Sequence, residues 1–334
     1  MIETDILIIG AGPVGLFTVF EAGLVKLRCH LIDYLPQAGG QLTEIYPKKP
    51  IYDIPGFPSI LAGELIDNLL LQAAPFKPGF TLGERAESIE RTEDGRFRVV
   101  SHGGTVHLAH VIAIAGGLGC FEPRKPPIAN ITDFEDKGVE YIIKDPEFYR
   151  NKNIVISGGG DSALDWTIFL ADVANEIILV HRRTEFRGAP DSVEKVLHLA
   201  AEGRIKLITE AEVVGLEGDE NALRAVEIQQ PEGIVTYPTD HFIPLFGLSP
   251  KLGPIANWSL NISKNAINVN TRDYSTSVDG IYAIGDINEY EGKLKLILCG
   301  FHEATIMVQS AWKRINPDKK LTLKYTTVNG VTAF

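Results

Sequence analysis

The chain has 334 residues, enough for two nucleotide-binding domains of ordinary size, and no apolar run in it reaches the length of a membrane span. A hydrophobic content of 45% and a charged content of 22% are typical of globular proteins, while the net charge of −11 argues against nucleic-acid binding, which needs a basic face. The first predicted strand starts almost at once, without a cleavable leader, so we expect a cytoplasmic protein that needs no membrane.

The N-terminal segment predicts a strand, a glycine-rich loop and a helix. Residues 5–9 are typical of a buried parallel strand, residues 14–22 predict a helix, and a second strand over 28–32 ends in Asp33, where an acid would hold ribose hydroxyls. The intervening loop needs a tight turn, a close approach to a pyrophosphate and tight helix packing, supplied in that order by Gly10, Gly12 and Gly15. Because all these features occur in the required order, dinucleotide binding is favoured over a merely structural turn.

The same pattern returns in the middle of the chain. A strand over 153–157 precedes a glycine-rich loop and a helix over 162–172, so the expected nucleotide contacts are Gly158, Gly160, Asp161 and Ser162. The next strand, 176–180, is followed by basic residues where the first segment has an acid: His181, Arg182, Arg183 and Arg187. Guanidinium groups pair with a ribose 2′-phosphate and an acid repels it, so we predict NADPH over NADH. The alternative is a solvated charge cluster.

A third segment, near the C-terminus, completes the predicted organisation. A strand over 278–286 is expected to end at Gly285 and Asp286, and a helix over 299–309 follows it. Residues 113–119 and 242–248 are expected to cross between the domains. The sequence thus predicts an α/β fold with two Rossmann-like, three-layer dinucleotide-binding domains, the second inserted into the first, with residues 1–115 and 245–334 in one domain and residues 116–244 in the other.

Cysteine and histidine positions bear on two kinds of chemistry. Cys29, Cys120 and Cys299 are widely spaced and form no Cys-x-x-Cys, which is typical of buried thiols in a reducing compartment. The eight histidines show no metal-ligand spacing, so we expect no metal site. Two dinucleotide loops without a redox disulfide indicate that electrons leave directly from a flavin.

Short motifs outside the two loops are more specific than the loops themselves. They are Gly39-Gly40-Gln41-Leu42, Ile45-Tyr46-Pro47, Ile51-Tyr52-Asp53, Gly56-Phe57-Pro58, Pro123-Arg124-Lys125, Gly160-Asp161-Ser162-Ala163-Leu164-Asp165-Trp166 and Tyr290-Glu291-Gly292-Lys293. Over nearly the whole chain, they resemble the ferredoxin–NADP reductases of the thioredoxin reductase-like type. Thioredoxin reductases proper carry two redox cysteines where this chain has Tyr141 and Lys144. Without that dithiol, thioredoxin cannot be reduced by thiol–disulfide exchange.

This resemblance implies a homodimer that binds FAD at the first loop and NADPH at the second and passes electrons to ferredoxin or flavodoxin. It implies that Asp33 holds the adenosine ribose, and that the flavin site is formed by Gln41, Tyr46, Ala86, Phe121, Asp286 and Thr327. Tyr46 would stack on one flavin face, and Tyr325 would cover the other face, in its own or the partner subunit. Two departures are that Asp33 is shorter than the glutamate common at this position, and that residues 328–334 match no motif.

The acceptor and the direction of electron flow stay open at this point. An acidic chain would meet an acidic ferredoxin through a local basic patch, for which the candidates are Lys48, Lys49, Arg124, Lys125, Lys293 and Lys295. Two other functions are a flavin-dependent reductase of a quinone or a thiol partner, and a redox-sensing flavoprotein without catalysis. No general acid or base is expected, because the flavin ring itself carries this chemistry.

Overall fold

The structure is a computed structural model that describes residues 1–119, 122–249, 251–321, 330, 331 and 333. The chain forms two compact units, of which the first combines Met1–Phe121 with Pro250–Phe334 and the second is Glu122–Ser249. The units divide after residues 121 and 249 rather than after the expected 115 and 244, since strands β9 (Glu122–Pro123) and β17 (Leu248–Ser249) pair with each other within the second unit. The second unit is thus inserted, in sequence, between the two parts of the first.

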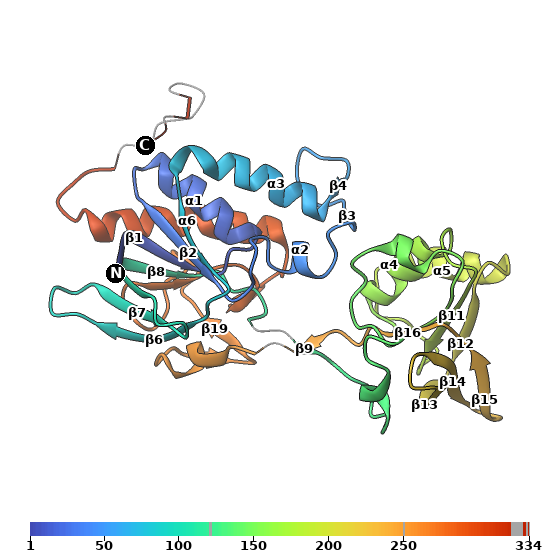
Figure 1. Cartoon of the computed structure of the whole chain (residues 1–334). Coiled ribbons are helices and arrows are strands. Elements are labelled where there is room, and N and C mark those ends of the chain that lie inside the picture. The colour runs from blue at the N-terminus through green and yellow to red at the C-terminus, as the bar shows by residue number, and fades with distance from the viewer. Residues whose placement is uncertain (120–121, 250, 322–329, 332, 334) are drawn as a thin grey trace. The chain divides into compact units, whose positions relative to one another are not determined.

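The first unit is built on a seven-stranded sheet with helices on one face (Figure 1). The strand order is β5 (Gly79–Leu82), β2 (Cys29–Asp33), β1 (Ile2–Ile9), β8 (Val106–Ile114), β7 (Phe97–Ser101) and β6 (Ala86–Arg91), and β20 (Ile281–Ala283) also pairs with β8. Strands β5, β2, β1, β8 and β20 pair in parallel, whereas β6, β7 and β8 pair antiparallel. The helices that cover the sheet are α1 (Pro13–Leu24), α3 (Ala62–Ala73) and α6 (Ile297–Ile315).

Both faces of the central strand β1 are buried. Ile6 and Ile8 pack in the core beneath the helices, while Leu7 and Ile9 pack in a second core on the opposite face. That second core is closed by β6, β7 and side chains from residues 252–267. A strand covered on both sides must be apolar throughout, which explains the uninterrupted hydrophobic run at the N-terminus.

Smaller elements complete the first unit. They are α2 (Gln41–Glu44), β3 (Pro50–Ile51), β4 (Ile60–Leu61), β18 (Ile262–Ser263), β19 (Ala266–Asn268), β21 (Asn288–Glu289) and the 3-10 helices Ala74–Phe76, Gly253–Asn257 and Gly285–Ile287. The predicted strand over 278–286 is wrong in extent: β20 is only three residues long, because the chain turns at Gly285, with a φ of +76°, into the last of these 3-10 helices. Helix α6 extends the expected 299–309 at both ends.

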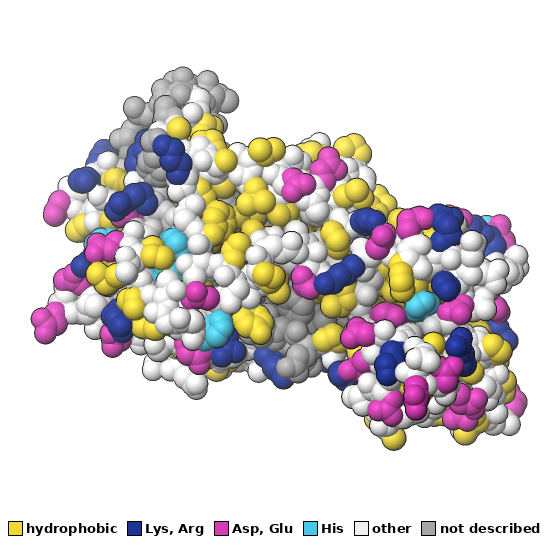
Figure 2. Space-filling model, viewed as in Figure 1, with side chains coloured by type: hydrophobic (Ala, Val, Ile, Leu, Met, Phe, Trp, Pro, Cys, Tyr) yellow, Lys and Arg dark blue, Asp and Glu magenta, His cyan; other side chains and the backbone are white. Residues whose placement is uncertain are grey.

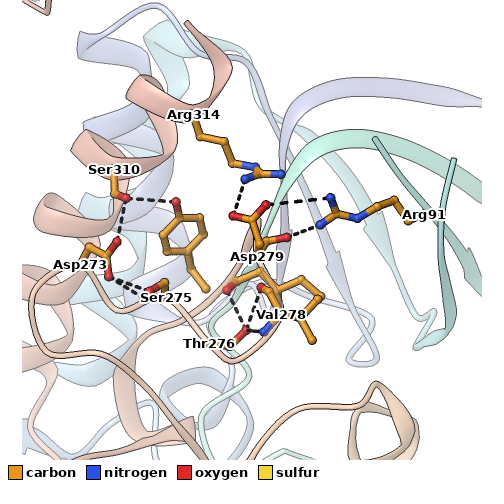
Figure 3. A network of polar contacts seen from close by, with 10 residues as sticks. Arg91, Asp273, Ser275, Thr276, Val278, Asp279, Ser310 and Arg314 are labelled. Carbon is orange, nitrogen blue, oxygen red and sulfur yellow. Dashed lines mark hydrogen bonds and ion pairs between the residues drawn. The ribbon is translucent and has the colours of Figure 1, made fainter. Parts of the chain in front are cut away.

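A polar network fastens the segment before β20 to its neighbours (Figure 3). Asp279 lies between Arg91 of β6 and Arg314 of α6, whose Nη1 is 2.5 Å from the Asp279 carboxylate. Nearby, Asp273 accepts hydrogen bonds from the hydroxyls of Ser275, at 2.7 Å, and of Ser310 in α6, at 3.0 Å. These contacts join the C-terminal part of the first unit to its sheet.

The second unit repeats the arrangement on a smaller scale. Its parallel sheet has the order β12 (Lys206–Thr209), β11 (Glu176–His181), β10 (Asn153–Ser157) and β16 (His241–Pro244). An antiparallel sheet of β13 (Glu212–Gly218), β14 (Leu223–Gln230) and β15 (Gly233–Pro238) joins it, with helices α4 (Asp161–Leu170) and α5 (Pro190–Ala201) and the 3-10 helices Ile131–Phe134 and Pro146–Tyr149. Within the described parts of both units, none of the helices has the length and apolar character required to cross a membrane.

Candidate dinucleotide-binding sites

The first glycine loop joins β1 to α1, and its three glycines have different surroundings. A Cβ on Gly10, whose φ is +110°, would lie 2.4 Å from the carbonyl oxygen of Ala115, and one on Gly15 would lie 2.1 Å from that of Gly10. A Cβ on Gly12 would meet no atom within 4 Å. Gly10 and Gly15 are therefore required by packing, whereas Gly12 faces open space.

The start of α1 suits an anion. Gly12 is its N-cap residue, no side chain caps it, and its first turn carries no acidic residue. The N–H groups at an uncapped helix start have no partner within the helix and, together with the helix dipole, favour a phosphate group. The residues at this loop therefore fit the pyrophosphate of a dinucleotide.

A pocket opens beside this loop, and most of the residues predicted from the sequence for the first site line it. Those that do are Gly10, Gly12, Asp33, Gln41, Tyr46, Ala86 and Asp286. Gly15 does not line the pocket but is buried within α1, in agreement with a packing role. Phe121, Tyr325 and Thr327 lie outside the described residues.

Asp33, at the end of β2, is tied to the glycine loop. Its Oδ2 accepts the backbone N–H of Ala11 at 2.6 Å, and its Oδ1 accepts that of Leu35 at 2.9 Å. Burial raises the pKa of Asp33, and these two hydrogen bonds oppose that rise. The carboxylate therefore shapes the loop, and each oxygen keeps a lone pair for a further donor.

The segment that carries Gln41 packs against the same loop. Gly39 donates its N–H to the carbonyl oxygen of Ala11 at 2.8 Å, and a Cβ on Gly40, whose φ is +59°, would lie 3.3 Å from the Cα of Gly12. Helix α2 then begins at Gln41. The motif Gly39-Gly40-Gln41 thus brings its glutamine to the pocket through backbone contacts.

Tyr46 and Asp286 both line the pocket, and each has a shifted pKa. Burial, together with the negative charge of Asp286, raises the pKa of Tyr46 to about 12, so its hydroxyl stays protonated. Burial also raises the pKa of Asp286, while the ammonium groups of Lys293 and Lys295 lower it. The Lys49 ammonium lies 5.7 Å from the centre of the Tyr46 ring.

Lys293 corrects one expectation, and Glu303 is a residue that the sequence reasoning missed. The Lys293 side chain is 2% exposed and its ammonium lies 2.5 Å from the carboxylate of Glu303, which is itself fully buried in α6. Lys293 therefore cannot belong to an exposed docking patch. The sequence indicated Glu303 only as an acid on the apolar face of a predicted helix. That pattern does not predict which residues bind it.

In the second unit, the glycine loop joins β10 to α4. A Cβ on Gly158 would lie 2.7 Å from Ala163 Cβ, whereas one on Gly160 would meet nothing within 4 Å. Gly160 is the N-cap residue of α4, and no side chain caps the helix. Asp161 and Ser162, both exposed, open the helix, and Asp161 accepts the N–H of Ala189 at 2.7 Å. Gly160 thus leaves this loop as open as Gly12 leaves the first one, but α4 differs from α1 in having an acid, Asp161, in its first turn.

The basic residues at the end of β11 and just after it divide into two kinds. His181 is 8% exposed, its Nε2 lies 3.0 Å from the carbonyl oxygen of Glu185, and its ring stacks on Phe186 with 4.9 Å between the ring centres. Burial lowers the pKa of His181, which favours the neutral ring. Its expected contact with NADPH stays a prediction. The exposed residues are Arg182, Arg183 and Arg187.

The three arginine side chains are available to a ligand. Within the described part of the chain, none of these guanidinium groups makes a hydrogen bond or an ion pair of its own. The backbone N–H of Arg187 donates to the carbonyl oxygen of Gly159 at 2.8 Å, which holds this segment against the glycine loop. The structure therefore brings the second loop and the basic segment together.

Comparison with known proteins places the chain among enzymes of one family. The family described as Pyridine nucleotide-disulphide oxidoreductase matches residues 4–310. Ferredoxin–NADP reductase 1 of Christiangramia forsetii is 69% identical over 100% of this chain and 96% of its own length. The ferredoxin–NADP reductase of Flavobacterium psychrophilum is 67% identical over 100% of this chain and 95% of its own length.

Solved structures show the same fold at lower identity. Thioredoxin reductase of T. acidophilum gives a TM-score of 0.82 at 21% identity, covering 95% of this chain and 100% of its own. Thioredoxin reductase of Lactococcus lactis gives 0.79 at 21% identity, covering 94% and 99%. The α/β fold with two dinucleotide-binding domains is confirmed. The chain belongs to the pyridine nucleotide-disulphide oxidoreductase family and, within it, to the ferredoxin–NADP reductases that share the thioredoxin reductase fold.

Proposed function

We propose that the chain is an FAD-dependent ferredoxin–NADP reductase, which moves electrons between NADPH and ferredoxin or flavodoxin. Membership of the pyridine nucleotide-disulphide oxidoreductases implies FAD and NAD(P)H, and relatives named ferredoxin–NADP reductase are 64% to 69% identical over the whole chain. The observation that carries the proposal is the pair of glycine loops, each with an uncapped helix N-terminus and an open second position. When bound, FAD supplies the hydride and single-electron chemistry.

In the first unit, we assign the FAD contacts by position in the pocket. The open N-terminus of α1 at Gly12 would hold the pyrophosphate, and Asp33 would hold the ribose. Tyr46 would stack on the ring as a neutral phenol, with Gln41 and Asp286 as polar contacts. Gly10 and Gly15 shape the loop, and Ala86 lines the pocket. The flavin roles of Phe121, Thr327 and Tyr325 rest on the resemblance alone.

In the second unit, we assign the preference for NADPH over NADH to the arginines after β11. The nucleotide's phosphates would meet the start of α4 at Gly158, Gly160, Asp161 and Ser162. An exposed guanidinium without a partner in the protein can pair bidentately with a 2′-phosphate, which NADH lacks. The burial of His181 leaves Arg182, Arg183 and Arg187 as the discriminating group.

We propose that electrons leave the flavin without a thiol relay. The positions of the redox cysteines in thioredoxin reductases are held by Tyr141, whose hydroxyl donates to Glu135 at 2.8 Å, and by Lys144. Cys29 is buried in β2 and burial raises its pKa, which keeps it a thiol rather than a nucleophilic thiolate. Cys120 lies outside the described residues. The sequence has no Cys-x-x-Cys.

The acceptor is proposed to be ferredoxin, guided by basic side chains at the pocket. Lys49 lies by Tyr46, and Lys295 is exposed and close enough to Asp286 to lower its pKa. On the face in Figure 2, acidic and basic side chains are interspersed over the second unit, which favours a local patch over a field of one sign. Among the other candidates, Lys48 is exposed, as are Arg124 and Lys125 of the second unit, where Lys125 is paired with Glu135.

We further propose a cytoplasmic homodimer. The resemblance assigns the C-terminal tail, with Tyr325, to a position over the flavin of its own or the partner subunit. Removal or movement of this ring would then be needed before nicotinamide approaches the flavin. Analytical ultracentrifugation tests the oligomer, and a crystal structure of the FAD complex tests the position of the tail.

The proposed function is tested by anaerobic stopped-flow mixing. We expect NADPH to bleach the flavin absorbance rapidly, NADH to do so much more slowly, and ferredoxin to restore the absorbance faster than a quinone does. Reoxidation faster with a quinone would favour a quinone reductase. No bleaching by either nucleotide would favour the redox-sensing flavoprotein.

A further inference from the structure

We propose that Glu303 is a positioning residue for FAD, which holds the Gly285–Asp286 turn in the shape that the cofactor needs. The inference rests on the proposed FAD site of the first unit. Glu303 does not line the pocket itself, whereas Gly285 and Asp286 both do. Its effect must therefore be carried by the backbone between them.

Both oxygens of the Glu303 carboxylate accept hydrogen bonds from one nine-residue segment, 285–293. Its Oε2 accepts the backbone N–H of Gly285 at 2.6 Å and the side-chain amide of Asn288 at 2.8 Å. Its Oε1 accepts the hydroxyl of Tyr290 at 2.9 Å and the ammonium of Lys293 at 2.5 Å. Each of the two carboxylate oxygens thus accepts two hydrogen bonds, and all four donors belong to this segment.

We infer that the shape of the Gly285–Asp286 turn depends on these hydrogen bonds from Glu303, which we call the tether. Gly285 has a φ of +76°, and the carboxylate of Asp286 makes no hydrogen bond to the described residues, so its position is set by its backbone. Helix α6 is seated closely beneath the pocket: a Cβ on Gly300 would lie 2.4 Å from Val14 Cγ2 and 3.4 Å from the Cα of Gly285. Glu303 therefore transmits the fixed position of α6 to the pocket wall.

Because Glu303 is paired with Lys293 in the interior, the two residues must be replaced together in any test of the tether. Glu303 and Lys293 form a pair whose side chains are 0% and 2% exposed, so that changing one alone leaves a buried charge and a general loss of stability. Two neutral double variants avoid this. Lys293→Met with Glu303→Gln keeps a carbonyl acceptor for Gly285, and Lys293→Met with Glu303→Leu has a similar volume and no acceptor.

The experiment is a fluorescence titration of each apoprotein with FAD. We expect the Gln variant to bind FAD within about threefold of the wild type, and the Leu variant to bind at least about tenfold more weakly than the Gln variant, as for the loss of one strong hydrogen bond. In an Asp286→Ala background, the difference between the two should shrink below about twofold. Equal affinities of folded Gln and Leu variants, or an undiminished difference without Asp286, would overturn the proposal.

Asp273→Asn provides the matched control. Asp273 ties α6 to the same C-terminal segment through Ser310, and it does not line the pocket (Figure 3). Its loss should lower the melting temperature and leave the FAD Kd within about twofold. A loss of affinity as large as that of the Leu variant would show that FAD binding merely follows stability, against the proposal.

Hydrogen exchange of the wild-type apoprotein gives an independent result if the Leu variant does not fold. The amide of Gly285 should be protected before FAD is added, and rapid exchange there would contradict the tether. A wild-type apoprotein that does not bind FAD at all would instead refute the proposed function.

Discussion

Gly12→Ala separates folding from cofactor binding at the first glycine loop. The backbone at Gly12 has φ −72° and ψ −175°, which alanine adopts without strain, and a Cβ there would meet no atom within 4 Å. The weaker N-cap of alanine costs about 1 kcal/mol, which the reduced freedom of the unfolded chain offsets by about 0.4 to 1 kcal/mol. The stability of the apoprotein should therefore change by less than about 1 kcal/mol.

The same methyl group points into the space where we place the pyrophosphate. Crowding of a well-packed site costs about 1 to 3 kcal/mol, which corresponds to a FAD Kd raised by about 5- to 150-fold. Chemical denaturation of the apoprotein and titration with FAD measure the two quantities separately. The control is Gly15→Ala, whose Cβ would lie 2.1 Å from the Gly10 carbonyl oxygen and should destabilise the apoprotein itself. Wild-type FAD affinity in Gly12→Ala would refute the placement.

Three other outcomes are expected. Arg182→Ala with Arg183→Ala should raise the Kd of NADP by at least about tenfold and that of NAD by less than about threefold, because each lost charge-assisted hydrogen bond is worth about 1.5 to 3 kcal/mol. Equal losses of affinity for NADP and NAD would exclude recognition of the 2′-phosphate by these arginines. Burial lowers the pKa of His30 to about 4 from an ordinary 6.5. The unfolded chain thus binds the proton more tightly, and stability should fall as the pH drops from 6.5 to 4, with a smaller slope in His30→Gln when urea midpoints are compared. Cys29→Ala with Cys299→Ala should keep ferredoxin-linked turnover within about threefold, and its collapse in a folded variant would return a thiol to the mechanism.

Local features of the fold could be predicted because they depend on residues close in sequence. The apolar run before Gly10 and the glycine spacing fix the strand, turn and helix through backbone sterics, and the same rule applies before Gly158. The end of β2 at Asp33 could be placed for the same reason. The predicted strand over 278–286 was too long at both ends, because glycines with a positive φ flank the apolar run: Gly280 precedes β20, and Gly285 begins the 3-10 helix that follows it.

The polar interior could not be predicted, since it depends on partners far apart in sequence. In the sequence, Lys293 and His181 stand in polar stretches and cannot be told apart from surface residues. Their burial follows from Glu303 in one case, and from Phe186 and the adjacent Gly159 in the other. The hydrogen bond from Ala11 to Asp33 likewise joins residues from two different strand ends. Such pairings are set by tertiary packing, which single-sequence patterns do not contain.

The stoichiometry of ferredoxin reduction by NADPH tests the central claim most directly. A limiting amount of NADPH is mixed anaerobically with the FAD-loaded protein and excess oxidised ferredoxin, and reduced ferredoxin is followed by its absorbance. Because a hydride carries two electrons and the flavin can release them singly, we predict about two ferredoxins reduced per NADPH consumed. Consumption of NADPH without reduction of ferredoxin would contradict the proposed function.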